Sequence, residues 1–198
     1  DPGKGLGLPG FVERELERSF GPSWPAEAEA LMQSRAPLDL RVNAAMAPRD
    51  QVASTLQAAD IASAPTPLSA FGLRLAGGTR VQDLPAFEAG LFEVQDEGSQ
   101  IAAWLAGAAP GMKVVDYCAG GGGKTLALGL AMSAQGRLIA CDLNPRRLDA
   151  IKPRLVRAGL WAEFHRVGPT GDKLDELKGQ ADRVLVDAPC SGSGTWRR

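Results

Sequence analysis

The sequence predicts an α/β fold in which an open parallel sheet follows a smaller α/β unit. After Lys113, strand-like and helix-like segments alternate in the order β-α-β-α-β-α-β, the pattern of a parallel sheet with right-handed crossovers. A glycine turn, Gly120 to Gly123, separates the first of these strands from its helix, as in nucleotide-binding sheets. Upstream, shorter segments show both periodicities. We expect two domains, residues 1–108 and 109–198.

Length and composition describe an ordinary globular protein. The chain has 198 residues, of which 23% are charged and 44% hydrophobic, and these values exclude a disordered protein. No apolar run reaches the roughly 18 residues of a membrane span, so we expect no membrane partner. A formal net charge of -1 gives no overall signal for nucleic acid, so any such contact must come from a local patch.

The cysteines point to a reduced, cytoplasmic setting. The three cysteines, Cys118, Cys141 and Cys190, form no C-x-x-C pair, and with His165 as the single histidine we expect no metal site. The first residues have no signal-peptide layout, and a start at Asp1 suggests a processed or shortened chain. We expect a monomer.

Periodicity and turn residues predict the elements of the first half. Phe11, Val12, Leu16 and Phe20 recur at helical spacing until Gly21-Pro22 ends the helix. Gly and Pro are dense between residues 61 and 90, which predicts compact connections without a long helix. The expected elements that follow the first helix are a helix over 26–34, a strand over 38–43, a helix over 48–59, strands over 73–75 and 90–94, and a helix over 101–108.

The second half repeats strand and helix more regularly. Val114 and Val115 end a buried strand, and Asn144-Pro145 is a good N-cap and first-turn pair for a helix that Gly159 ends. Pro153 should kink or interrupt that helix. The other expected elements are a helix over 124–133, strands over 137–142, 163–167 and 183–186, and a short helix over 172–177.

Three ligands could use the glycine turn. A dinucleotide fingerprint requires a third glycine at the position of Thr125, so the match to this motif is weak. A Walker A loop requires a glycine where Cys118 stands, although Gly123-Lys124-Thr125 supplies its end and Val184 to Asp187 imitates a magnesium-binding strand. The third ligand, S-adenosylmethionine, needs close backbone approach and an acid at the end of the next strand for its ribose hydroxyls. Asp142 stands there, although a helix-capping or solvated carboxylate would also explain an acid at this position.

A second cluster, Asp187 to Gly194, follows the last predicted strand. Because the carboxyl ends of parallel strands share one edge of the sheet, it should face the glycine turn. Cys190, with small neighbours and Arg197-Arg198 nearby, is a candidate thiolate, although a cysteine after a strand is more often inert packing.

Together the two clusters resemble the motifs of a known family. Asp116-x-Cys118-Ala119-Gly120-x-Gly122-Gly123-Lys124, Asp142 and Asp187-Ala188-Pro189-Cys190 are similar to the S-adenosylmethionine and target-base motifs of the Sun/Fmu (RsmB-like, NSUN) RNA cytosine-5 methyltransferases. Upstream, Leu40 to Asn43 resembles part of that family's small RNA-binding subdomain, and Val94 to Gln100 the segment before its catalytic domain. The resemblance covers the chain from about residue 11.

The resemblance implies a fold, a cofactor and a reaction. It implies a Rossmann-like methyltransferase sheet, incomplete at its C-terminus, that transfers a methyl group from S-adenosylmethionine to a cytosine in RNA, with ribosomal RNA as the expected partner. It assigns catalysis to Cys190, Asp187 and Lys124. The residues that it implies for cofactor binding are Asp116, Cys118, Ala119, Gly120, Gly122, Gly123, Lys124, Asp142, Asp172 and Asp187.

The chain also departs from the family's pattern. The family's nucleophile is a second cysteine in a downstream Thr-Cys motif, and the cysteine that matches Cys190 helps to release product. In DNA cytosine methyltransferases, however, the Pro-Cys cysteine is itself the nucleophile, so both roles stay open for Cys190. Because the sequence stops at Arg198, before any such motif, we expect a longer enzyme. The alternative functions are a P-loop-like nucleotide-binding NTPase and a non-catalytic RNA-binding fragment. The usual acid after the third strand is missing from residues 166–171, and Asp172 is the candidate for the adenine edge. Candidate RNA contacts are Arg41, Arg146, Arg147, Arg154 and Arg157, although a solvated helix face is the simpler interpretation of residues 146–157.

Overall fold

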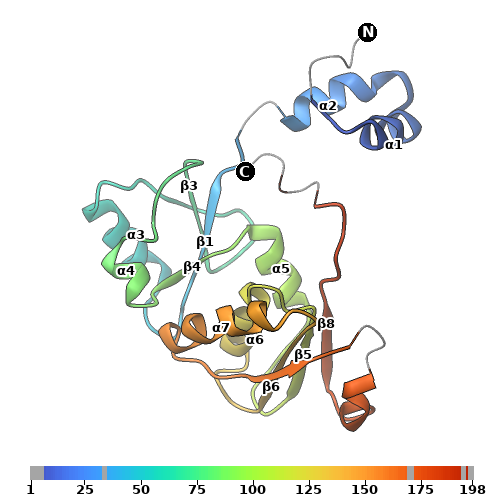
Figure 1. Cartoon of the computed structure of the whole chain (residues 1–198). Helices are drawn as coiled ribbons and strands as arrows, with labels where there is room; N and C mark the ends of the chain where they lie inside the picture. Colours follow the sequence, from blue (N-terminus) through green and yellow to red (C-terminus); the bar gives the residue numbers. More distant parts are fainter. Residues whose placement is uncertain (1–6, 33–34, 169–171, 193–194, 196–198) are drawn as a thin grey trace. The chain divides into compact units, whose positions relative to one another are not determined.

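A computed structural model describes residues 7–32, 35–168, 172–192 and 195. Figure 1 follows the chain through its helices and strands. The chain divides into two compact units, one formed by Leu38–Cys190 and the other by Asp1–Pro37 with Ser191–Arg198. Both sheets belong to the larger unit, and the domain boundary expected at residue 108 falls between them and stays a prediction. Within the described part of the chain, every helix is too short or too polar to cross a membrane.

The described part of the smaller unit is mainly helical. Its elements are α1 (Gly10–Phe20), the 3-10 helix η1 (Gly21–Ser23) and α2 (Trp24–Met32). The helix expected over 11–20 is therefore confirmed. The second helix begins two residues before the expected Ala26, and residues 33 and 34 of its expected range lie outside the described residues.

The first sheet is antiparallel, and β1 lies inside it. Its strands are β1 (Leu38–Val42), β2 (Ala64–Pro65), β3 (Gly72–Leu75) and β4 (Phe92–Val94), in the order β2-β3-β1-β4. The helices α3 (Arg49–Ala58) and α4 (Pro85–Glu88) accompany this sheet. Apolar side chains from both layers, such as Leu40, Leu56 and Phe92, form one buried core. The strand β2 and the short helix α4 were not expected.

Helix α5 (Glu97–Leu105) connects the two sheets and begins four residues before the expected Ile101. The cause is a cap. The Asp96 carboxylate accepts a hydrogen bond of 2.9 Å from the backbone N–H of Gly98, one of the donors that the first turn leaves unpaired. Gly98 and Ser99, which favour helices weakly, are therefore part of the helix.

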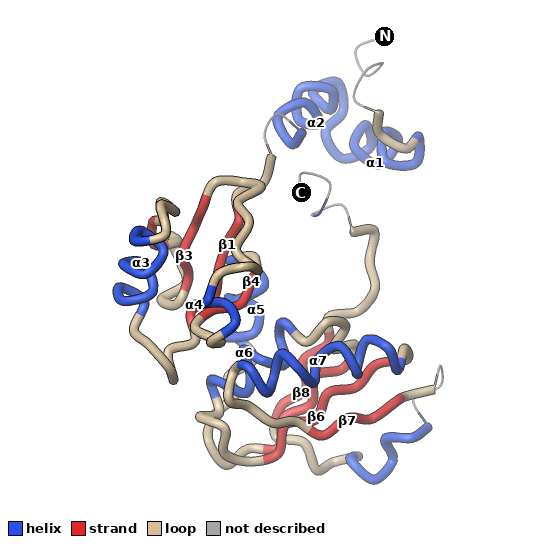
Figure 2. Tube along the Cα trace, turned by 60° about the vertical axis from the view of Figure 1, so that its left-hand side comes forward, coloured by secondary structure: helices blue, strands red, loops and turns tan. Residues whose placement is uncertain are grey.

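The second sheet is fully parallel, as the sequence predicts. Its strands are β5 (Lys113–Tyr117), β6 (Arg137–Asp142), β7 (Glu163–Arg166) and β8 (Arg183–Val186), in the order β7-β6-β5-β8. The connecting helices are α6 (Gly123–Ala131), α7 (Pro145–Arg157) and the 3-10 helix η2 (Asp172–Leu177). Figure 2 shows helices α6 and α7 beside these strands. This strand order is that of a Rossmann-like methyltransferase sheet.

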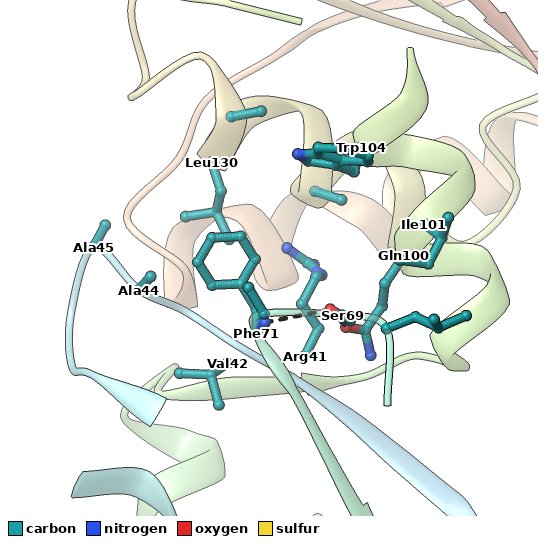
Figure 3. Close-up of a pocket in the computed structure, with 14 residues that line it drawn as sticks. Arg41, Val42, Ala44, Ala45, Ser69, Phe71, Gln100, Ile101, Trp104 and Leu130 are labelled. Atoms are coloured by element: carbon teal, nitrogen blue, oxygen red, sulfur yellow. Dashed lines mark hydrogen bonds between the residues drawn. The ribbon is translucent and has the colours of Figure 1, made fainter. Parts of the chain in front are cut away.

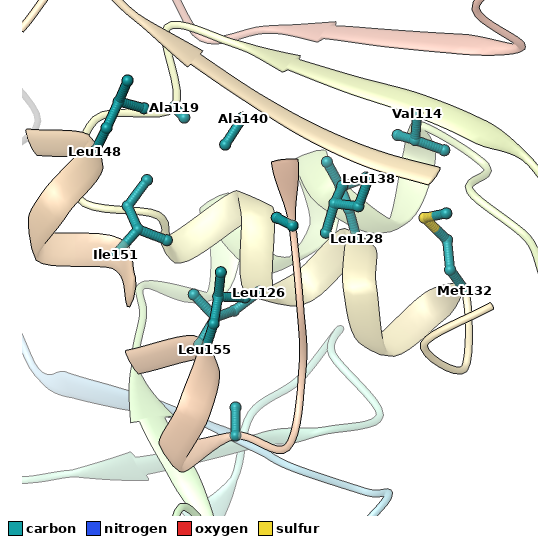
Figure 4. Close-up of a cluster of buried hydrophobic side chains, with 12 residues drawn as sticks. Val114, Ala119, Leu126, Leu128, Met132, Leu138, Ala140, Leu148, Ile151 and Leu155 are labelled. Carbon is teal, nitrogen blue, oxygen red and sulfur yellow. The ribbon is translucent and has the colours of Figure 1, made fainter. Parts of the chain in front are cut away.

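The main core of the second sheet lies under α6 and α7 (Figure 4). Leu126 and Leu128 of α6 and Ile151 of α7 are fully buried there, against Leu138 of β6. The sequence predicted that Pro153 would kink or interrupt this helix. Pro153 lies inside α7, and the helix is not interrupted. Burial of Ile151 and Leu155 on either side of Pro153 offsets the hydrogen bond that a proline cannot donate.

Candidate active site

The acids predicted for the site come together at one edge of the second sheet. Strand β5 pairs in parallel with β6 and β8, and Asp116 lies opposite Ala140 and Leu185 in the register. Asp142 is the last residue of β6, and Asp187 comes directly after β8, so both lie at the same edge of the sheet as Asp116. The two motif clusters share this edge, as open parallel sheets require of a ligand site.

The loop between β5 and α6 needs its glycines for two different reasons. Gly120 and Gly122 have positive φ angles of 55° and 83°, and Cys118 also lies in this region at 67°. A Cβ atom on Gly122 would lie 2.7 Å from the side chain of Ile151, so helix packing excludes any larger residue. A Cβ atom on Gly120 would meet only the Cys118 carbonyl, at 3.9 Å. The loop surface at Gly120 is therefore open enough for close approach of a ligand.

Asp142 holds this loop in place. The residue is 5% exposed, and its Oδ2 accepts a hydrogen bond of 2.9 Å from the Gly120 N–H. Its Oδ1 accepts one of 2.8 Å from the Asn144 N–H, while the Asn144 side chain caps α7. Each carboxylate oxygen has a second lone pair. The two simpler roles weighed for Asp142 do not apply, because Asn144 caps α7 and Asp142 is buried, and the carboxylate keeps acceptor capacity for hydroxyl groups.

Asp116 lies beneath the loop, fully buried. Its Oδ2 accepts a hydrogen bond of 2.6 Å from the Thr125 hydroxyl, and its Oδ1 has no hydrogen-bond partner among the described residues. Burial raises the pKa of Asp116 to about 6, and the Thr125 hydrogen bond opposes this shift only in part. Thr125, which interrupts the dinucleotide fingerprint, thus anchors the start of α6 to β5, a role that the motif comparison did not reveal.

Lys124 and Asp187 join the two motif clusters directly. The Lys124 Nζ lies 2.7 Å from the Asp187 Oδ2, and the two side chains are 17% and 59% exposed. An exposed carboxylate beside an ammonium group can bind the polar edge of a base. This ion pair is the most direct evidence that the glycine loop and the segment after β8 form one site.

The three cysteines differ in exposure. Cys190 is exposed, Cys118 is partly buried and Cys141 is fully buried. Burial raises the pKa of the Cys141 thiol to about 12, and burial and the nearby Asp142 also raise the pKa of Cys118. Cys141 is therefore a packing residue, whereas Cys190 is accessible.

Several predicted site residues lie partly or wholly outside the part of the chain that the structure describes. The backbone of Asp172 lies in η2, but its side chain falls outside the described residues. Ser193, Gly194 and the Arg197-Arg198 pair lie wholly outside the described residues.

Buried polar residues of the first sheet reach the glycine loop. The Glu93 carboxylate on β4 accepts hydrogen bonds from Arg154 and Arg157 of α7, and Arg154 also donates to the Gly121 carbonyl. Arg41 on β1 is 4% exposed and donates a hydrogen bond of 2.6 Å to the Gln95 side chain. Three of the five arginines considered for RNA contact thus serve internal contacts. Arg154 and Arg157 do not lie on a solvated helix face.

Comparison with known families agrees with this geometry. Residues 102–198 match a model described as 16S rRNA methyltransferase RsmB/F, and residues 9–82 match its ferredoxin-like domain. The chain is 36% identical over 190 residues to the ribosomal RNA small subunit methyltransferase B of Pseudomonas syringae pv. tomato, covering 93% of this chain and 42% of that protein. The corresponding protein of Pseudomonas putida is 35% identical, with 93% and 43% covered. The chain therefore spans less than half the length of these relatives.

Solved structures show the same fold. A methyltransferase homolog from Pyrococcus horikoshii superimposes with a TM-score of 0.82 and 27% identity, over 98% of this chain and 63% of that one. NSun6 from Pyrococcus horikoshii, solved with SFG, gives a TM-score of 0.83 over 96% of this chain and 74% of that one, at 17% identity. These matches do not support the alternatives of a P-loop NTPase or a non-catalytic module.

Proposed function

The chain belongs to the RsmB/F family of 16S rRNA methyltransferases, and on this premise we propose that it carries the methyl-donor and target-base motifs of an RNA (cytosine-5) methyltransferase. The observation that carries the proposal is the Lys124–Asp187 pair, because it joins an open glycine loop to the Asp-Ala-Pro-Cys segment. The proposed substrate is a cytosine in ribosomal RNA, the substrate class that the relatives' names indicate.

The residues around the glycine loop fit S-adenosylmethionine. The open backbone at Gly120 allows close approach of the donor's amino acid portion, and Asp142 has acceptor capacity for two ribose hydroxyls. Cys118, Ala119, Gly122 and Gly123 shape the same loop, and Asp116 supports it from below. When bound, the donor supplies an electrophilic methyl group on its sulfonium sulfur. The chain's own residues then have to orient the base.

Carbon 5 of cytosine is a poor nucleophile, and this defines what the protein must provide. A cysteine thiolate would have to add to carbon 6 so that carbon 5 becomes nucleophilic; as the bond from carbon 5 to the methyl group formed, the methyl–sulfur bond would break and leave a neutral thioether. A base would then remove the proton from carbon 5, and the re-formed C5–C6 double bond would expel the thiolate. Asp187 accepts hydrogen bonds from the polar edge of the ring, and Lys124 holds Asp187 in place and balances its charge. Both lie where the two motif clusters meet.

Cys190 acts in this scheme as the cysteine that assists release of the product. It is exposed and follows Asp187 by three residues, so it lies near the base-binding edge. By the family resemblance, the nucleophile is then a second cysteine in a downstream Thr-Cys motif, and this chain spans only 42% of the first relative's length. A Cys190→Ala variant of a full-length enzyme should accumulate a covalent RNA adduct if Cys190 assists release, and should form none if Cys190 is the nucleophile.

Calorimetry tests the donor assignment. The chain should bind S-adenosylmethionine or S-adenosylhomocysteine, and ATP with magnesium should give no heat of binding. Binding of ATP with magnesium in the absence of donor binding would refute the proposal. The reaction itself is tested with a C-terminally longer chain and undermethylated small-subunit RNA, because transfer to carbon 5 is detected by mass spectrometry of the nucleosides.

A further inference from the structure

A cavity of about 270 Å³ lies between the first sheet and helices α5 and α6, within the Leu38–Cys190 unit. Figure 3 shows its lining, which comes from β1, the segment between β2 and β3, and the two helices. Its walls include Phe71, Trp104 and Leu130, and its polar side chains are those of Arg41, Ser69 and Gln100. The functional assignment above uses none of these side chains, so the cavity requires its own explanation.

The aromatic walls of the cavity are open to solvent. Phe71 is 45% exposed and Trp104 67% exposed, which is unusual for two large apolar side chains at the mouth of one cavity. Several alanines line the space between them and leave room for a flat group; these are Ala44, Ala45, Ala70, Ala127 and Ala131. Exposed aromatic rings beside an open, apolar space are the arrangement on which unstacked nucleobases bind.

Arg41 supplies a buried positive charge at this cavity. Its Nε donates to Gln95 at 2.6 Å and its Nη2 lies 3.5 Å from the Gly123 carbonyl, but its Nη1 has no hydrogen-bond partner in the described part of the chain. Burial lowers the pKa of Arg41 to about 10, so it stays charged at neutral pH. Because Nη1 is closed off from solvent, Arg41 contributes a positive charge beside the cavity, which attracts an electronegative atom of a ligand, and not a free donor.

The other polar groups at the cavity satisfy one another. The Ser69 hydroxyl donates to Gln100 at 2.7 Å, and Gln100 donates in turn to the carbonyls of Leu40 and Gln95. Glu97 is turned towards the backbone of the loop, where it accepts from Leu68 and Ser69. Among the described lining residues there is no carboxylate, so a ligand that belongs to an anionic chain meets no negative charge that would repel it.

We propose that this cavity binds a nucleobase of the RNA other than the target cytosine, stacked against Phe71 and Trp104 with a base carbonyl or ring nitrogen towards Arg41. This proposal rests on the proposed function, because it assumes an RNA substrate. Arg41 connects the cavity with the donor loop through Gly123, and α6 runs from that loop along the cavity wall. The base therefore belongs to a nucleotide close to the target in space, and the cavity adds a contact that recognises unstacked RNA.

Binding of a labelled 12-nucleotide oligo(rU) tests the proposal, because this RNA has no cytosine for the catalytic site. The reference is an abasic ribose-phosphate chain of the same length. Trp104→Ala and Phe71→Ala should each weaken oligo(rU) binding about tenfold, the scale of one lost stacking contact. Trp161→Ala is the matched control, because Trp161 has the same exposure of 67% and lies outside the cavity. Arg41 itself is not replaced, since its buried contacts make misfolding the expected result.

The ratio of the affinity for oligo(rU) to the affinity for the abasic chain should fall in Trp104→Ala and stay unchanged in Trp161→Ala. In the unmodified chain this ratio should persist at higher salt, because stacking does not depend on phosphate charge. Equal RNA binding by Trp104→Ala, Phe71→Ala and Trp161→Ala would overturn the proposal. An absence of RNA binding by the unmodified chain would overturn it as well. Calorimetry with S-adenosylhomocysteine, run on the same samples, separates these outcomes from failure of the proposed function.

Discussion

The Glu93 carboxylate on β4 accepts a hydrogen bond of 2.8 Å from Nη2 of Arg154 on α7, although the two residues are 61 positions apart. The Arg154 Nη1 donates to the Gly121 carbonyl in the glycine loop. One guanidinium group therefore joins the first sheet, the helix and the proposed donor loop. Because the loop is built from glycines with several accessible conformations, a fixed contact at Gly121 reduces the entropy that donor binding would otherwise cost.

We expect Arg154→Gln to weaken binding of S-adenosylmethionine about tenfold, which corresponds to about 1.4 kcal/mol. The free energy of unfolding should fall by only about 1 kcal/mol, because Arg157 still pairs with Glu93 and the Arg154 side chain is a quarter exposed. Calorimetry and denaturant unfolding measure the two quantities. Lys152→Gln is the control on the same helix, since Lys152 forms an exposed ion pair with Asp149. Unchanged donor affinity in Arg154→Gln would show that Gly121 needs no anchor.

The sequence predicted those parts of the fold that depend on local signals. Alternating strands and helices, the Asn144-Pro145 cap and the glycine turn led to the parallel sheet and placed the three acids at its edge. The two-residue strand β2 is too short to show a periodicity. It also contains Pro65, and a proline is tolerated in a strand only at the edge of a sheet, which is where β2 lies. The start of α5 was missed because Gly98 and Ser99 outweighed the capping signal of Asp96.

The contacts between the sheets could not be predicted in this way. Arginines at 154 and 157 have the spacing of a solvated helix face, and only the tertiary fold brings Glu93 to them. Similarly, Arg41 in an alternating strand segment carries no sign that its guanidinium will be buried beside Gln95. Such pairs depend on how two sheets pack, which no single-sequence periodicity reports.

Asp142→Asn should lower the affinity for S-adenosylhomocysteine ten- to a hundredfold. The charged acceptor is lost, and an amide NH₂ would replace an oxygen that now accepts from Gly120 or Asn144. The 2′-deoxy form of the ligand distinguishes ribose binding from loop support. If Asp142 binds the ribose, removal of the hydroxyl weakens binding to the unmodified chain but has little further effect on Asp142→Asn. Equal losses in both proteins would mean that Asp142 supports the loop alone.

Asp187→Asn should leave stability nearly unchanged and abolish most of the activity. The carboxylate is largely exposed, so its ion pair with Lys124 contributes little to folding. As the proposed acceptor at the base edge, however, it should affect methyl transfer by a C-terminally longer enzyme by about 10²- to 10⁴-fold. Single-turnover rates and thermal melting give the two values. Asp149→Asn, at a similarly exposed ion pair on α7, should change neither, and a loss of activity below threefold in Asp187→Asn would contradict the proposed role.

Alkylation should separate the three cysteines. Iodoacetamide at neutral pH should modify Cys190 first, Cys118 more slowly and Cys141 last, because Cys141 is fully buried and its pKa is raised to about 12. Bound S-adenosylhomocysteine should slow the reaction at Cys118 and not at Cys190. Mass spectrometry of the peptides follows each site, and unfolding in guanidinium should remove the differences. Modification of Cys141 as fast as Cys190 would be inconsistent with the described packing.

The buried carboxylate of Asp116 should make stability depend on pH in an unusual direction. Burial raises its pKa in the folded protein to about 6, above its ordinary value of 3.8, so the folded state holds the proton more tightly than the unfolded state does. The stabilisation from this proton is fully present below about pH 4 and is lost as the pH rises through 6.

Between pH 4 and pH 7.5, Asp116 should therefore remove about 3 kcal/mol from the free energy of unfolding, estimated from a shift of about two pKa units. Asp116→Asn cannot ionise, and its side-chain oxygen can still accept from Thr125. Urea unfolding of both proteins over this pH range should give a difference that grows with pH in favour of the variant. Asp149→Asn should show no such growth. Parallel curves for Asp116→Asn and the unmodified chain would mean that Asp116 ionises in its ordinary range despite its burial.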